Sequence, residues 1–336
     1  LKKLFQEAYL KHANLADATR YLANALFGHY GLVILDADDA NLKRQFIPFI
    51  KEEVLKQTAF SKVNETIEQF GNYTVQVNPR EINLFFIEDN LRERIIFEDG
   101  GYKINNTKRH FSEQELLAEL ELHPEKFSPN VVMRPLYQEV ILPNLAYIGG
   151  GGEIAYWLEL KSFFETVKVT FPMLIVRNSV VLATEKQLKK ADALALNWSD
   201  LFQKQTLLIN NKTKQLSEFA IDLSDLKQQL QQQFQALNEL TYKTDRSFAG
   251  AVKAQEVKQT KGLEQLEKRL LKAQKRKLAD SLSRITALQN ELFPNQSLQE
   301  RQANFSEFYL ENGEQLLPKL VNEIKPLSTN FTIITF

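Results

Sequence analysis

Residues 145–157 read Leu-Ala-Tyr-Ile-Gly-Gly-Gly-Gly-Glu-Ile-Ala-Tyr-Trp, an apolar run that passes through four glycines into a helical pattern. Such a run, closed by a glycine loop, is typical of a buried strand that leads into a helix of an α/β sheet. Ligands bind at this end of parallel strands, because unpaired N–H groups and the positive end of the helix dipole point there. A tight turn without a ligand is the alternative. The loop matches neither the dinucleotide fingerprint nor the phosphate-binding loop, so it indicates no particular nucleotide.

Two flanking segments carry polar side chains that suit a ligand site. Arg134 can bind a carboxylate or phosphate through two parallel hydrogen bonds, and Asn130 and Gln138 can bond amides or hydroxyls. Arg177 and Asn178 follow an apolar run that predicts another strand. If the sheet is parallel, these side chains and the glycine loop meet at one edge. For any single residue, a surface salt bridge or a cap is the alternative.

Residues 1–71 are expected to form one part of the α/β core. Apolar spacing predicts a helix over 1–27, with a break near Asn14. The continuous apolar run 32–35 predicts a buried parallel strand. Helices are then expected over about 40–55, interrupted by Pro48, and over 61–70.

Residues 72–127 have the character of a small α+β insertion. Short β-type runs over 73–77, 82–87, 94–98 and 102–104 alternate with turn-forming groups, which predicts antiparallel strands. Ser112 and Glu115 form a capping-box pattern at the start of a helix over 112–122.

The rest of the core is expected over 128–205, with a strand over 145–148, a helix over 153–164, and 172–177 with 180–183 as a strand pair or one bent strand. Residues 206–293 predict an antiparallel coiled-coil hairpin, because apolar residues recur every three or four positions on both sides of a polar break at 244–251. Residues 294–336 are expected to pack back on the core, with helices near 298–309 and 313–324 and an edge strand over 331–336.

Composition excludes several classes of function. The 336 residues include no cysteine, which excludes disulfides and thiolate chemistry. Lys plus Arg equals 42 and Asp plus Glu equals 42, so no net field attracts nucleic acid, and the basic stretch 268–277 is interpreted as a solvated helix face. No apolar run reaches the roughly 18 residues of a membrane span. We therefore expect a cytoplasmic protein that binds neither nucleic acid nor a membrane.

A metal site is not expected. The four histidines lack the spacing of metal ligands. Asp36, Asp38 and Asp39 could bind Mg²⁺, but they are better interpreted as capping the helix that follows them.

Three neighbouring segments form a specific pattern: Phe-Ser-Pro-Asn-Val-Val-Met-Arg-Pro-Leu-Tyr-Gln-Glu at 127–139, Leu-Pro-Asn-Leu-Ala-Tyr-Ile-Gly-Gly at 142–150 and Glu-Ile-Ala-Tyr-Trp at 153–157. In these segments the chain resembles the BshC family of bacillithiol biosynthesis. Asn-Pro-Arg-Glu-Ile-Asn-Leu-Phe-Phe at 78–86, Arg-Glu-Arg-Ile at 92–95 and Leu-Gln-Glu-Arg at 298–301 are similar to further motifs of the family.

The resemblance implies a Rossmann-like core of the class I ligase and nucleotidyltransferase type, a small antiparallel β insertion, and a coiled-coil hairpin through which two copies dimerise. It also implies a ligase that joins cysteine to glucosaminyl-malate by an amide bond and so forms bacillithiol. By analogy with class I ligases that activate cysteine, ATP, with or without Mg²⁺, would activate the cysteine carboxylate.

On this interpretation, three residues are candidates for catalysis: Arg134, Glu153 and Arg177. The candidates for substrate or nucleotide binding are Asn130, Gln138, Gly149, Gly150, Gly151, Gly152, Tyr156 and Asn178. The two arginines would hold a carboxylate or phosphate, the loop amides would face the reacting group, and Glu153 would orient the substrate amine.

Two further expectations accompany this hypothesis. Family members begin with an additional amino-terminal stretch that carries a histidine motif; we expect the present chain to lack it, and therefore to be poorly soluble or inactive by itself. The alternative function is a non-catalytic interaction protein that works through its coiled coil. Ligand binding at the glycine loop would separate the two functions, whereas dimerisation would not.

Overall fold

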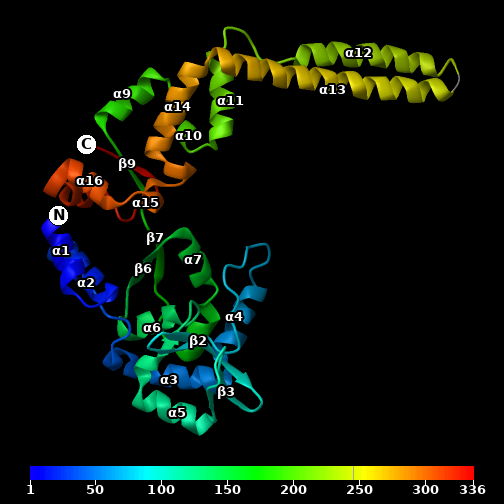
Figure 1. The fold of residues 1–336 in the computed structure, drawn as a ribbon. Coiled ribbons are helices and arrows are strands. Elements are labelled where there is room, and N and C mark those ends of the chain that lie inside the picture. The colour runs from blue at the N-terminus through cyan, green and yellow to red at the C-terminus, as the bar shows by residue number, and fades with distance from the viewer. Residues whose placement is uncertain (245) are drawn as a thin grey trace. The chain divides into compact units, whose positions relative to one another are not determined.

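The structure is a computed structural model that describes residues 1–244 and 246–336, which form two compact units. Unit 1 contains Leu1–Asn178 and Lys325–Thr329, and unit 2 contains Ser179–Ile324 and Asn330–Phe336. The chain therefore divides after residue 178, whereas the sequence-based division assigned residues up to 205 to the core. Figure 1 shows the order of the elements, and each unit is described by itself below.

Unit 1 begins with two helices, α1 (Lys2–Lys11) and α2 (Leu15–Phe27), followed by the short 3₁₀ helix η1 (Gly28–Tyr30). Asn14 caps α2 by accepting a hydrogen bond from the Asp17 N–H at 2.8 Å, so the predicted break is confirmed.

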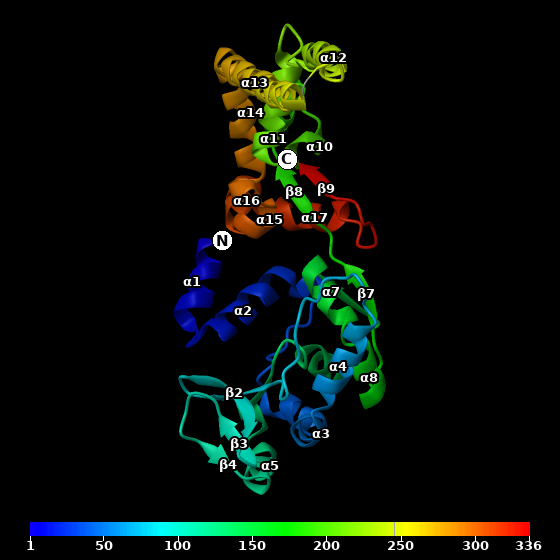
Figure 2. The ribbon, with the colours of Figure 1, turned by 90° about the vertical axis from the view of Figure 1, so that its right-hand side faces the viewer.

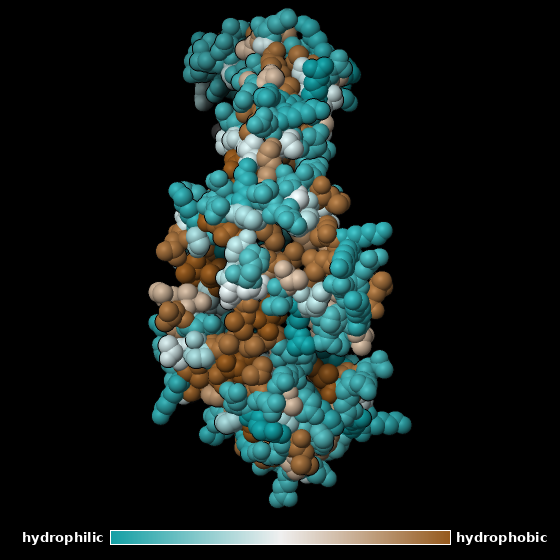
Figure 3. Space-filling view, turned by 90° about the vertical axis from the view of Figure 1, so that its left-hand side faces the viewer, coloured by the Kyte–Doolittle hydropathy of each residue, from teal (hydrophilic) through white to brown (hydrophobic). Residues whose placement is uncertain are grey.

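The predicted buried strand over 32–35 is wrong. These residues form no strand, and the side chain of Val33 is 74% exposed. A strand requires the hydrogen bonds of a neighbouring strand, which an apolar run does not itself supply. Figure 3 views the side of unit 1 on which α1 and α2 lie and shows hydrophobic side chains gathered at the surface there.

Helices α3 (Ala40–Lys56) and α4 (Thr58–Glu68) follow. The predicted interruption at Pro48 is wrong, because α3 continues through this residue. Proline removes one hydrogen bond of the helix, but Phe46, Ile47 and Ile50 bury one face of α3 in the core of unit 1. Tertiary packing thus outweighs the local preference to break.

The insertion is a five-stranded antiparallel sheet in the order β4-β3-β2-β1-β5. Its strands are β1 (Leu84–Glu88), β2 (Leu91–Glu98), β3 (Gly101–Ile104), β4 (His110–Phe111) and β5 (Phe127–Pro129). The predicted antiparallel insertion is confirmed, except that 73–77 form no strand. Two backbone N–H groups of that segment, those of Gln76 and Val77, donate instead to the Glu159 carboxylate at 2.6 and 3.3 Å.

The predicted capping box at Ser112 and Glu115 is confirmed at the start of α5 (Glu113–Leu122), which the 3₁₀ helix η2 (Pro124–Lys126) follows. The remaining elements of unit 1 are α6 (Arg134–Ile141), β6 (Ala146–Gly149), α7 (Gly151–Leu158), α8 (Lys161–Val167) and β7 (Met173–Val176). The single helix predicted over 153–164 is therefore two helices. Strands β6 and β7 are parallel, with Gly149 opposite Val176.

Unit 2 contains a second parallel pair, β8 (Val180–Ala183) and β9 (Thr332–Thr335), which lie side by side in Figure 2. The expected pairing of 172–177 with 180–183, or their joining into one bent strand, is wrong, because β7 pairs with β6 and β8 pairs with β9. The predicted terminal strand is confirmed as β9.

Helices surround this strand pair: α9 (Glu185–Ala193), α10 (Trp198–Leu201), α11 (Gln205–Leu216), α14 (Ala279–Leu292), α15 (Gln299–Gln302), α16 (Phe305–Asn312) and α17 (Leu316–Glu323), with short 3₁₀ helices η3 (Pro294–Gln296) and η4 (Gly313–Gln315). Val181, Leu208 and Ile285 are fully buried in the core that they form.

The predicted helical hairpin is confirmed as α12 (Ser224–Thr241) and α13 (Arg246–Lys277), which run side by side in Figure 1. It is shorter than the predicted range 206–293, because α11 and α14 pack in the core of unit 2. Lys227 on α12 pairs with Glu267 on α13 at 2.7 Å. The predicted polar break was too long, since α13 already begins at residue 246; residue 245 lies outside the described residues. Among those described, no helix combines the length and apolarity that a bilayer span needs.

Candidate functional site

The four glycines of the loop have different structural roles. Gly149 ends β6, Gly150 caps α7, and Gly151 and Gly152 form the first turn of that helix. A Cβ on Gly149 would lie 2.6 Å from Cε1 of Tyr147, so any other residue there would have to displace the tyrosine ring. Around Gly151 and Gly152 a Cβ would meet no atom within 4 Å, and both residues are exposed. The first turn of α7 is therefore open to the close approach of a ligand.

Glu153 places a negative charge at the same helix start. Its Oε2 accepts a hydrogen bond from the Gly150 N–H at 2.8 Å, and its Oε1 accepts one from the Tyr147 hydroxyl at 3.3 Å. The Gly150 N–H lowers the pKa of Glu153 most, and the Tyr147 hydroxyl and the charges of Arg134 and Arg177 lower it further. The carboxylate is consequently ionised at neutral pH and can accept hydrogen bonds from an ammonium group.

Arg134, the first residue of α6, supplies the positive charge of the site. Its Nη2 donates to the Tyr156 hydroxyl at 2.6 Å and its Nη1 to Oε1 of Gln138 at 3.1 Å. Burial by itself would lower the pKa of Arg134, but the hydroxyls of Tyr156 and Tyr147 raise it above its usual value. Both hydrogen-bond partners are neutral, so the guanidinium remains available to attract an anion.

The remaining candidates are bound within the fold. Oδ1 of Asn130 accepts hydrogen bonds from the N–H groups of Val132 and Met133 at 2.8 and 3.3 Å. Nδ2 of Asn178 donates to the carbonyls of Lys325 and Ser328. These two asparagines thus stabilise the backbone at residues 132–133 and 325–328. Gln138 accepts a hydrogen bond from Arg134 and helps to hold its side chain in place.

Arg177 lies at the end of β7, next to the glycine turn. Its backbone N–H donates to the carbonyl of Gly149 at 2.8 Å, and its side chain is half-buried. The charges of Arg177 and Arg134 both act on Glu153, so these three residues gather near the glycine turn, at the carboxyl ends of β6 and β7.

Tyr147 belongs to the candidate site by its contacts, and sequence reasoning missed it. Its ring stacks on Trp157 with centroids 4.1 Å apart, and burial raises the pKa of its hydroxyl. Because Tyr147 lies within an apolar strand, its sequence context is that of a core residue. Its spacing from Gly149 could have identified it: residues 147 and 149 point to the same face of the strand, and the missing side chain of Gly149 leaves room for the tyrosine ring.

Of the acidic cluster before α3, Asp39 caps the helix as interpreted from the sequence, whereas Asp36 and Asp38 form salt bridges instead. Oδ1 of Asp39 caps α3 by accepting from the N–H groups of Asn41 and Leu42. Asp38 pairs with the buried Lys43 at 3.2 Å, and Asp36 pairs with Arg20. Within the described ranges, no three His, Asp or Glu side chains come together as metal ligands would.

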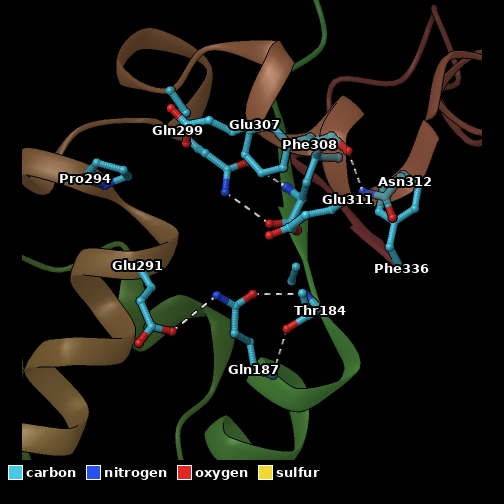
Figure 4. A pocket seen from close by; sticks show the side chains of 13 residues that line it. Thr184, Gln187, Glu291, Pro294, Gln299, Glu307, Phe308, Glu311, Asn312 and Phe336 are labelled. Carbon is cyan, nitrogen blue, oxygen red and sulfur yellow. Dashed lines mark hydrogen bonds between the residues drawn. The ribbon is translucent and has the colours of Figure 1, made fainter. Parts of the chain in front are cut away.

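Unit 2 has a separate cavity of about 190 Å³ at the carboxyl ends of β8 and β9 (Figure 4). Its amide side chains serve the fold. Gln299 bonds both the N–H and the carbonyl of Leu182, and Gln187 accepts from the Thr184 N–H and donates to Glu291. None of the residues predicted for the site lines this cavity.

The glycine turn provides the first test of these assignments. Because its Cβ would displace the Tyr147 ring, Gly149→Ala is expected to lower the free energy of unfolding of unit 1 by about 1–3 kcal/mol. Gly151→Ala meets no atom and should leave stability unchanged or raise it by up to about 1 kcal/mol. Denaturant unfolding measures both; equal losses would contradict the different roles of the two glycines.

Comparison with known families identifies both units. Residues 1–178 match the family described as "Bacillithiol biosynthesis BshC, N-terminal Rossmann-like domain", and residues 180–336 match "Bacillithiol biosynthesis BshC, C-terminal coiled-coil domain". The two matches meet where the two units divide. The predicted fold class, a Rossmann-like core with a small antiparallel insertion and a coiled coil, is confirmed.

Curated relatives align with nearly the whole length of this chain. The chain is 71% identical over 335 residues to a protein of Flavobacterium johnsoniae, 62% over 334 residues to one of Flavobacterium psychrophilum, and 28% over 329 residues to one of Staphylococcus carnosus. Each of them bears the name "Putative cysteine ligase BshC". These alignments cover 100%, 99% and 94% of the chain but only 63%, 63% and 60% of the relatives, so the chain spans less than two thirds of their length.

Proposed function

Since the chain belongs to the BshC family of bacillithiol biosynthesis, we propose that it provides the ligase site that joins cysteine to glucosaminyl-malate and so forms bacillithiol. The observation that carries the proposal is the placement of Arg134, held by Tyr156 at 2.6 Å, beside the glycine turn and the ionised Glu153. A cation and an anion thus lie at the carboxyl ends of two parallel strands, where α/β proteins bind their ligands.

This arrangement suits the two reactants of an amide ligation. Arg134 and Arg177 hold the carboxylate of cysteine or the phosphate that activates it, and the exposed N–H groups of Gly151 and Gly152 face the oxygen on which negative charge develops. Glu153 accepts hydrogen bonds from the substrate amine and directs it toward the carboxyl carbon. Tyr156 keeps the guanidinium in place and thereby fixes the position of the acyl group.

ATP is the activating cosubstrate in this proposal. Amide formation removes one oxygen from the cysteine carboxylate. ATP transfers a phosphoryl or adenylyl group to this oxygen, which then leaves as part of phosphate or AMP when the amine attacks. The two guanidinium groups and the open first turn of α7 fit an anionic cosubstrate. Mg²⁺ would enter bound to the phosphates of the nucleotide.

The hairpin supports association with a second copy, the partner that we propose for it. Between α12 and α13, a groove is lined by Leu226, Leu230, Leu263 and Leu266, and Leu266 is 54% exposed. The same surface favours the alternative function, a non-catalytic interaction protein in the cytoplasm. Dimerisation is compatible with both functions, whereas a ligand bound at the glycine turn is expected only of the ligase.

Reconstitution tests the proposal. The purified full-length protein is incubated with cysteine, glucosaminyl-malate and Mg–ATP, and bacillithiol is quantified by mass spectrometry. We expect the product only when all three substrates are present. Amide formation without ATP would refute the activation step, and the absence of product under every condition would refute the ligase.

A further inference from the structure

A buried carboxylate lies behind the candidate site without a basic partner in the interactions of the described residues. The side chain of Glu53 on α3 is 1% exposed. Its Oε2 accepts from the Ala59 N–H at 2.9 Å, and its Oε1 accepts from the backbone N–H and the Nδ2 of Asn83 at 3.0 and 2.8 Å. Burial raises the pKa of Glu53 above its usual value, and these donors offset only part of that increase. A buried carboxylate is costly unless its oxygens are hydrogen-bonded, so the three donors are essential.

The side chain of Asn83 connects this carboxylate to the side chain of Asn130 through hydrogen bonds. It is fully buried, and its Nδ2 donates to Glu53 and to the carbonyl of Arg80. Its Oδ1 accepts from the N–H of Arg80 at 3.0 Å and from Nδ2 of Asn130 at 2.9 Å. The amide therefore uses two donors and two acceptor sites, and only one of its two possible orientations fits.

The orientation of the Asn83 amide in turn fixes the orientation of the Asn130 amide, which lies at the start of α6. Because its Nδ2 faces Asn83, its Oδ1 faces α6 and accepts from the N–H groups of Val132 and Met133. The backbone carbonyl of Asn130 accepts from the backbone N–H of Arg134 at 2.8 Å. Asn130 thus fixes the turn at which α6 begins, and Arg134 is the first residue of that helix.

We propose that Glu53 and Asn83 are positioning residues that set the amide orientation of Asn130 and thereby hold Arg134 in place for its ligand. The inference rests on the proposed function only for the identity of that ligand. Glu53 and Asn83 are not expected to touch a substrate, because both are buried and every polar atom of their side chains has a partner within the fold.

The variant Glu53→Gln tests the relay from Glu53 through Asn83 to Asn130. The substitution replaces one carboxylate oxygen by an NH₂ group. This NH₂ must face either the Ala59 N–H or the two donors of Asn83, so a donor meets a donor in both orientations. If Asn83 turns over to avoid this conflict, its NH₂ then faces Nδ2 of Asn130, and the conflict reaches α6. The relay predicts this second orientation, in which exchange at the amides of residues 132–134 quickens by about tenfold or more. If the new NH₂ faces Ala59 instead, only the amide of residue 59 exchanges faster, and the relay is contradicted.

Glu159→Gln is the matched control, because Glu159 is also a fully buried carboxylate that accepts two backbone N–H groups, those of Gln76 and Val77. It should quicken exchange at residues 76 and 77 and leave residues 132–134 protected. Adding Asn83→Asp to Glu53→Gln places acceptors toward the new NH₂ and toward Nδ2 of Asn130, at the cost of the hydrogen bond to the Arg80 carbonyl, and should restore part of the protection at 132–134. This double variant also covers the case in which Glu53→Gln alone fails to fold.

Exchange is measured on the chain without substrate, so its outcome does not depend on ligase activity. Unchanged protection of 132–134 in Glu53→Gln, or an equal effect of Glu159→Gln, would overturn the positioning role. In the full-length enzyme we further expect Glu53→Gln to lower kcat/KM about tenfold or more while Glu159→Gln keeps it near the original value. Equal losses in the two variants would also overturn it. If exchange responds as expected but the original enzyme forms no bacillithiol, only the proposed function fails.

Discussion

Arg134→Ala should lower kcat/KM for bacillithiol formation by about 100- to 1,000-fold in the full-length enzyme, the loss typical when a group that stabilises developing charge is removed. Arg134 is the guanidinium that Tyr156 and Gln138 hold beside the glycine turn. In the proposed site, its removal leaves the reacting carboxylate with Arg177 alone in place of two guanidinium groups. Steady-state kinetics with cysteine, glucosaminyl-malate and ATP provide the measurement.

Two arginine variants make this result interpretable. Arg134→Lys keeps the charge but loses the planar fork, so an intermediate rate is expected. Arg109→Ala removes an arginine that pairs with Glu88 in the insertion, and it should leave the rate within about twofold, as for other surface substitutions. A rate of Arg134→Ala equal to that of Arg109→Ala would show that Arg134 does not act on the reacting groups.

Trp157→Ala should lower the free energy of unfolding of unit 1 by about 3–5 kcal/mol. Trp157 is fully buried, its ring stacks on Tyr147 at 4.1 Å, and it also contacts Phe164 and Phe171. Truncation leaves a cavity directly beneath the strand that carries the glycine turn. Denaturant unfolding followed by circular dichroism measures the loss.

The next residue on the same helix serves as the control for this prediction. Leu158 is 51% exposed, so Leu158→Ala should change the stability by less than about 1 kcal/mol. Should Trp157→Ala prevent folding altogether, Trp157→Phe keeps an aromatic ring and is expected to show a smaller loss. Equal stability of the Leu158 and Trp157 variants would contradict the role of Trp157 in the core.

Features that depend on neighbours in the chain could be predicted from the sequence. The strand, glycine turn and helix around Gly149 follow from a local pattern, as do the capping box of α5 and the heptad spacing of the hairpin. The placement of Glu153 at this turn follows from the same local pattern. Arg134 is expected there only on the assumption of a parallel sheet, and its contact with the site is with Tyr156, 22 positions away.

Features that depend on distant partners could not be predicted in this way. The run 32–35 has the composition of a strand but no strand beside it, and α3 passes Pro48 because its buried face outweighs one lost hydrogen bond. Asn130 looked like a ligand-binding amide, yet its partner Asn83 lies 47 positions away. Nothing in either local sequence indicates that hydrogen bond.

The most direct test of the ligase is made in the organism that encodes the protein. The complete gene is deleted, and bacillithiol and glucosaminyl-malate are quantified in the cell extract. The proposed function predicts that bacillithiol disappears, that glucosaminyl-malate accumulates, and that the intact gene reverses both changes. Unchanged bacillithiol in the deletion strain would contradict the ligase function and would favour an interaction protein that works through its coiled coil.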